Sequence, residues 1–170
     1  MEEIRNKIKE SGLVSIDLAD FKPDRSSIVG FDIADQLWQG LVLKEKDFRN
    51  FIATNDWSVF AGKNVYVFCS ADAIVPTWAY MLVCSKLKDI AAFSIAGNEI
   101  DLQKFLIQQK IDAFDLSQHS AGRFIVKGCA DIPCPEFAMV SLTLKLQTVA
   151  KSIMYGEPCS TVPIYKAPKK

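Results

Sequence analysis

Apolar and polar stretches alternate along this 170-residue chain in a way that predicts strands and helices in turn. Short apolar runs bounded by turn residues are typical of buried strands, and apolar residues three or four positions apart are typical of helices. From about residue 62 onward the two patterns alternate regularly, which predicts parallel βαβ units with right-handed crossovers. The predicted strands are 65–69, 91–96 and 124–127, and the predicted helices are 76–87, 99–110 and 135–155.

The pattern before residue 62 is less regular but belongs to the same class. It predicts strands over 13–17, 28–33 and 41–43 and helices over 1–11 and 45–54. Gly156 is expected to end the last helix, before an extended segment stiffened by prolines. Together these elements predict an α/β fold in a single domain of residues 1–170, with a mainly parallel sheet flanked by helices.

Composition narrows the classes of protein to consider. The 49% apolar residues supply a core, and 20 basic residues balance 20 acidic ones, so we expect no nucleic-acid partner. No apolar run approaches the roughly 18 residues of a membrane helix, so we expect no membrane partner either. The first residues lack the apolar core of a secretory signal, and five cysteines is an odd number, which favours reduced thiols in the cytoplasm.

Two stretches of the chain, 65–81 and 124–139, have similar sequences when they are aligned with one gap. Each reads as an apolar strand, a cysteine, an Ala-Asp pair, a proline and an aromatic-Ala pair. This alignment places Cys69 and Cys129 at equivalent positions, where a strand gives way to a helix. In open α/β sheets ligands bind outside the carboxyl ends of the strands, so this is where we expect a site.

A thiol at such a junction lies close to backbone N–H groups, which favour the thiolate that binds metals or attacks electrophiles. Cys159 is the third candidate, since a stiff, proline-flanked segment would suit a preset ligand. Three thiols and a fourth ligand, from Asp72, Asp131 or water, would complete a tetrahedral site for zinc or iron. The alternatives stay open: the cysteines fill the core, and the aspartates form turns or cap helices.

The remaining candidates carry weaker signals. His119, the only histidine, lies in a polar loop, where it either joins a site or is simply solvated. Cys84 lies inside a predicted helix and is expected in the core, while Cys134 stands between two prolines with no diagnostic spacing. The chain has no G-x-G-x-x-G or P-loop motif, so the standard nucleotide cradles are not expected.

The chain resembles a known family at three segments, 69–81, 127–129 and 156–163. On these segments it is similar to the bacterial family called domain of unknown function 2480. The resemblance extends over nearly the whole chain, including the stretches 43–48 and 55–57.

The resemblance implies a functional setting. Genes of this family often lie beside those of the sulfur-mobilisation (SUF) system that assembles iron–sulfur clusters. It therefore implies iron–sulfur assembly proteins as partners, and implies that Cys69, Cys129 and Cys159 handle metal, sulfide or a cluster.

Three functions follow as hypotheses. The first is a small accessory protein that binds a metal ion or an iron–sulfur cluster through three cysteines. The second is a structural or adaptor protein whose cysteines belong to the core, and the third is a carrier of a thiol-bound group such as persulfide. No catalytic base stands out, so an enzyme is not expected, and the oligomeric state is left open.

Overall fold

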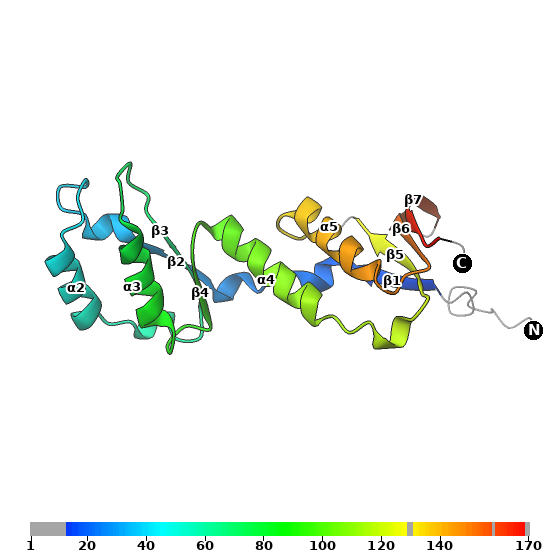
Figure 1. Cartoon of the computed structure of the whole chain (residues 1–170), viewed down its shortest axis with the longest axis horizontal. Helices are drawn as coiled ribbons and strands as arrows, with labels where there is room; N and C mark the ends of the chain where they lie inside the picture. The colour runs from blue at the N-terminus through cyan, green and yellow to red at the C-terminus, as the bar shows by residue number, and fades with distance from the viewer. Residues whose placement is uncertain (1–12, 129–130, 158, 169–170) are drawn as a thin grey trace, which may run out of the picture. The chain divides into compact units, whose positions relative to one another are not determined.

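The computed structural model describes residues 13–128, 131–157 and 159–168. The chain divides into two units, each with its own sheet and apolar core (Figure 1). Unit 1 consists of Met1–Pro23 and Lys104–Lys170, and unit 2 of Asp24–Gln103. Each unit is described by itself below.

Unit 2 is a three-stranded parallel sheet with two helices. Its strands lie in the order β2-β3-β4. The core forms where Val65 and Val67 of the central strand, fully buried, meet Phe48 and Leu87 of the helices. The elements are β2 (Ile28–Asp32), α2 (Glu45–Thr54), β3 (Asn64–Phe68), α3 (Thr77–Leu87) and β4 (Phe93–Ala96), with the 3-10 turns η2 (Arg25–Ser27), η3 (Ile33–Gln36) and η4 (Ser58–Phe60).

Unit 1 is a four-stranded sheet in the order β1-β5-β6-β7, parallel except for the last strand. Phe124 and Val126 of β5 are buried against Leu142 and Ile107 of its helices. The elements are β1 (Leu13–Asp17), η1 (Leu18–Phe21), the part of α4 (Glu99–Ala113) from residue 104 onward, η5 (Ser117–His119), β5 (Arg123–Lys127), α5 (Pro135–Leu146), β6 (Ser152–Glu157) and β7 (Ser160–Lys166).

The two units repeat one another. The bounds of β3 and η4 recur 59 positions later in β5 and η5, and the same shift carries α2 onto residues 104–113 of α4. Likewise β2 and η3 repeat β1 and η1 with a shift of 15 positions. The backbone repeats in the same way. Gly62 and Ala121, 59 positions apart, both have positive φ (67° and 56°). Their N–H groups donate to the carbonyl oxygens of Ile90 and Val149, which are also 59 positions apart.

The predicted α/β class with mainly parallel strands is confirmed. The predicted βαβ unit β3-α3-β4 lies within unit 2 (Figure 1). The predicted run β4-α4-β5 is not such a unit, because β4 and β5 belong to different sheets, and the unit β5-α5-β6 was not predicted. The parallel strands are shared between two sheets, and the assignment of residues 1–170 to one domain stays a prediction. The helix predicted over residues 1–11 falls outside the described residues.

The prediction of a single helix over residues 135–155 was wrong. The helix ends at Leu146, and Ser152–Glu157 forms β6. A turn follows the helix, in which the backbone N–H of Ala150 donates to the carbonyl oxygen of Leu146. The apolar residues after the turn form a strand because they pair with β5. Gly156 therefore lies inside a strand, with φ of 115°, and does not cap a helix. The predicted strand 41–43 reduces to one bridge between Trp38 and Val42.

Candidate functional site

Cys69 lies at the carboxyl end of the central strand of unit 2. It follows β3 directly, is half-buried, and packs against the core of the unit. Its thiol donates to the carbonyl oxygen of Ala71, with 3.6 Å between sulfur and oxygen. The sequence prediction that this thiol lies at a strand end is therefore confirmed, and one side of it belongs to the core.

Asp32 ends the neighbouring strand β2 and faces the same edge. Its carboxylate accepts from the backbone N–H of Ala34 at 2.9 Å and from that of Ser70 at 3.0 Å. Burial would raise the pKa of this carboxyl, but the Ser70 hydroxyl and the two N–H donors together lower the pKa below its usual value. Asp32 is therefore a fixed negative charge next to the residue that follows Cys69.

Tyr80, on the first turns of α3, faces these two groups. Burial raises the pKa of its phenol, and electrostatic interactions with Cys69 and Asp32 raise it further. The phenol therefore remains protonated at neutral pH. The edge thus combines a thiol, an ionised carboxylate and a neutral phenol, and its electrostatic potential favours a cation.

Asp72, predicted as a fourth ligand, is exposed in a bend after Cys69. It does not cap α3, whose N-cap is Pro76 without a side-chain bond. In the part of the chain that the structure describes, Asp72 forms no hydrogen bond or ion pair, so its carboxylate is available to a ligand.

At the corresponding edge of unit 1, Cys129 lies outside the described residues. Its neighbour Gly128 packs under Tyr155 so closely that an added Cβ would lie 2.2 Å from the phenol oxygen. Asp131, also predicted as a ligand, pairs with Lys22. Cys159 is exposed in the turn that joins β6 to β7. The described residues thus place Cys159 and Asp131 in unit 1 and Cys69 and Asp72 in unit 2.

The repeat corrects the alignment of the two cysteines. Without a gap, the shift of 59 positions that relates β3 to β5 carries Cys69 onto Gly128 and Ser70 onto Cys129. The same shift relates Asp72 to Asp131 and Pro76 to Pro135. Cys69 and Cys129 are therefore neighbouring positions of the repeat rather than equivalent ones.

The other candidates are placed elsewhere. Burial raises the pKa of Cys84, which lies inside α3 and packs against the core as expected. Cys134 precedes α5 in a left-handed conformation, with φ of 53°. His119 packs between Phe114 and Phe124, with ring centroids 6.4 and 6.0 Å away. It precedes β5, so it lies at the opposite end of this sheet from the turn that carries Cys159.

Among the described residues no three His, Cys, Asp or Glu side chains converge on a place for a metal ion. The grouping that does form, Cys69 with Asp32, Ser70 and Tyr80, was missed apart from its cysteine. One signal was present: residues 14–20 and 29–35 share the pattern Val-x-apolar-Asp-apolar-Ala-Asp. A repeat of that kind marks Asp32 as the end of a strand.

Comparison with known proteins gives one result. A family model described as "Protein of unknown function (DUF2480)" matches residues 2–167. No curated protein and no solved structure matches the chain. Among the described residues, no helix has the length and apolar character needed to cross a membrane.

Proposed function

Since the chain belongs to the DUF2480 family over residues 2–167, we propose that its function is the one implied by its strand-end cysteines: binding a metal ion or an iron–sulfur cluster as a cytoplasmic accessory protein. Thiolates are the protein ligands that zinc and iron–sulfur clusters share. The ligands proposed are Cys69, Cys129 and Cys159, with Asp72 or Asp131 as oxygen donors. Iron–sulfur assembly proteins are the proposed partners, on the strength of the gene neighbourhood that the family resemblance implies.

The observation that carries this proposal is the negative charge beside Cys69. A catalytic thiol needs positive neighbours to lower its pKa. Cys69 instead has Asp32, held ionised by Ser70 and Ala34, next to its strand end. The Asp32 carboxylate would stabilise a cation bound to the sulfur of Cys69. Cation binding therefore fits the edge better than persulfide or acyl transfer does.

The surroundings of each donor side chain decide which of them can serve as metal ligands. Cys69 supplies one soft donor, and Asp32 already accepts from two backbone N–H groups and a hydroxyl. Asp72 is exposed and hydrogen-bonds to no described residue, so it is the better oxygen ligand in this unit. In unit 1, Cys159 is exposed on a turn, where it can meet a partner protein.

The test is elemental analysis with an absorption spectrum on untagged chain purified without oxygen or chelator. We expect close to one equivalent of zinc or iron, lost in Cys69→Ser, Cys129→Ser and Cys159→Ser. Cys84→Ser is the matched control, because Cys84 is half-buried in the same unit but packs against the core. Loss from only some of the three variants would restrict the ligand set.

A metal-free wild-type chain, with all variants folded and alike, would overturn the proposal. That outcome would support an adaptor protein, and one observation already favours it as the second candidate. A pocket of about 250 Å³ in unit 1 is lined almost wholly by apolar residues of α5, β6 and β7, among them the exposed Val140, Leu144 and Ile164. An exposed apolar surface of this kind is typical of protein–protein contact.

A further inference from the structure

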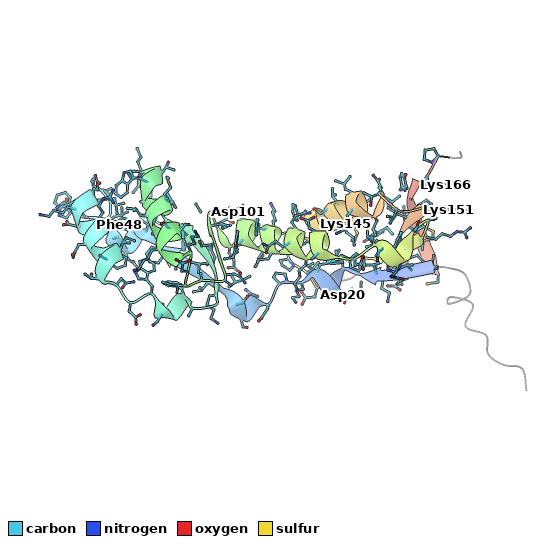
Figure 2. All side chains as sticks on the ribbon, turned by 60° about the horizontal axis from the view of Figure 1, so that its bottom comes forward. Asp20, Phe48, Asp101, Lys145, Lys151 and Lys166 are labelled. Atoms are coloured by element: carbon cyan, nitrogen blue, oxygen red, sulfur yellow. The ribbon has the colours of Figure 1, made fainter. Side chains whose placement is uncertain are left out.

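Three cations of unit 1 line one pocket on the sheet. Arg123 begins β5, Lys151 precedes β6 and Lys166 ends β7. Together with Ser152 and Met154 they line a pocket of about 350 Å³. Figure 2 shows Lys151 and Lys166 at the same end of the unit, where β6 begins and β7 ends.

The strand register explains why these side chains meet. Arg123 pairs with Ser152, and Ser152 pairs with Lys166. Paired residues of neighbouring strands point to the same face, and strands lie about 4.8 Å apart. The backbones of Arg123 and Lys166 are therefore about 10 Å apart in this row, with Ser152 between them. Met154 and Pro163, paired beyond a register shift in the β6-β7 ladder, add apolar residues to the lining of the pocket.

The described lining of the pocket carries positive charge and no carboxylate. Among the described residues no Asp or Glu lines the pocket, and none of its three cations forms a salt bridge. Like charges facing one another on a sheet destabilise it. An anion bound between the cations would remove that repulsion. Because the whole chain has a net charge of zero, the excess of positive charge is local to this pocket.

Unit 2 shows that the fold does not require these charges. The position that corresponds to Arg123 is Asn64, which donates from its amide to the Ser27 hydroxyl at 3.0 Å. The position that corresponds to Ser152 is Phe93. The same row is therefore uncharged in one copy of the repeat and cationic in the other.

We propose that this row of unit 1 binds the phosphate group of a small phosphorylated molecule. An arginine fork matches two phosphate oxygens, a lysine adds a point charge, and the Ser152 hydroxyl lies between them as a further donor. A phosphate monoester carries nearly two negative charges, which suits three cations better than one carboxylate does. The volume of about 350 Å³ leaves room for a small organic group against Met154 and Pro163. This site is separate from the proposed cysteine ligands, and neither proposal depends on the other.

The test titrates the full-length chain with inorganic phosphate and with phenyl phosphate at constant ionic strength, followed by calorimetry or amide chemical shifts. We expect saturable binding of both, with phenyl phosphate tighter, and at least about tenfold weaker binding in Arg123→Gln and Lys166→Gln. Lys46→Gln is the matched control, since it removes the same charge from an exposed helix position of unit 2.

Three results would overturn the proposal: no saturable binding of either anion, unchanged affinity in both pocket variants, or an equal loss in Lys46→Gln. The last result would show a general charge effect. Folding of each variant is checked by its urea midpoint. Lys151→Gln, which changes a turn residue outside the strands, provides a second route if a strand variant fails to fold.

Discussion

Unit 1 and unit 2 build the same core and differ on the opposite face of the sheet. Val65 and Val67 of β3 are buried as completely as Phe124 and Val126 of β5, the residues 59 positions later. The alternate residues of the two strands have diverged: where β3 has Asn64, Tyr66 and Phe68, β5 has Arg123, Ile125 and Lys127.

This difference teaches which positions the fold constrains. Residues that face the helices must fill a close-packed space, so they stay apolar. The described residues on the second face of β3 and β5 lie outside the two core clusters, and they carry the chemistry that distinguishes the units. Cys69 departs from this rule, because it packs against the core of unit 2 at the position where unit 1 has Gly128.

The largest expected effect tests whether the two cores are equivalent. Leu87 of α3 and Leu146 of α5 correspond in the repeat and are both fully buried. We expect Leu87→Ala and Leu146→Ala each to lower the free energy of unfolding by about 2–5 kcal/mol, through lost burial and a cavity. Urea denaturation measures both. A loss below about 1 kcal/mol in only one variant would contradict the equivalence of the cores.

The second prediction concerns a glycine in each unit that lies under a tyrosine of the adjoining strand. An added Cβ at Gly30 would lie 2.6 Å from the ring of Tyr66, and one at Gly128 would lie 2.2 Å from Tyr155. We expect Gly30→Ala to cost about 1–3 kcal/mol in stability. Gly128→Ala should cost less, because Tyr155 is 39% exposed and free to swing away, whereas Tyr66 lies 5.2 Å from the ring of Phe68.

The matched controls are the double variants Gly30→Ala/Tyr66→Ala and Gly128→Ala/Tyr155→Ala. If the ring contact is the cause, adding the alanine at the glycine should cost little once the tyrosine is gone. The interpretation would fail if the glycine substitution cost the same with and without the ring, as measured in a double-mutant cycle.

The third prediction compares the aspartates that end β1 and β2. Asp17 accepts from the N–H of Ala19 at 3.0 Å, and Asp32 accepts from Ala34 and from Ser70. Losing a capping carboxylate costs about 1 kcal/mol, so we expect that loss for Asp17→Ala and about 2 kcal/mol for Asp32→Ala. Thermal unfolding measures both. Equal losses would show that the two strand ends are held alike and that Ser70 adds nothing.

Part of this structure follows from sequence alone. The periodic segments 13–17 and 45–54 predict the bounds that β1 and α2 have, because one amphipathic pattern dominates each. The segment 135–155 does not, because apolar residues on both sides of the turn near Ala150 form one helical pattern. Only pairing with β5 shows that the second part is a strand.

The same limit applies to the sites. The strand end at Cys69 could be predicted because strand and turn signals are local. The approach of Asp32 to Ser70 could not, because the two are 38 residues apart in sequence and meet only through the parallel register of β2 and β3. The cationic row of Arg123, Ser152 and Lys166 arises in the same way, from three strands in register.

The smallest expected effect is a pH dependence that both units share. Asp56 and Asp115, 59 positions apart, precede η4 and η5. The backbone N–H and the hydroxyl of Ser58 lower the pKa of Asp56, and those of Ser117 lower the pKa of Asp115. A carboxyl whose pKa is lower in the folded state stabilises the fold at pH values above its unfolded-state pKa. That stability is lost as the pH falls through the folded-state pKa.

The double variant Asp56→Asn/Asp115→Asn should therefore lose less stability than the wild type between neutral pH and about pH 3. Urea midpoints across this range measure this loss.

The stabilising contributions of Asp56 and Asp115 should also differ in their dependence on ionic strength. Electrostatic interactions with His119 and Lys145 contribute to the lowered pKa of Asp115, and no such interaction contributes at Asp56. Raising the ionic strength should weaken the contribution of Asp115 and leave that of Asp56 unchanged. Equal salt sensitivity of the two single variants would show that hydrogen bonds to the serine alone set both pKa values, and that the two turns are electrostatically alike.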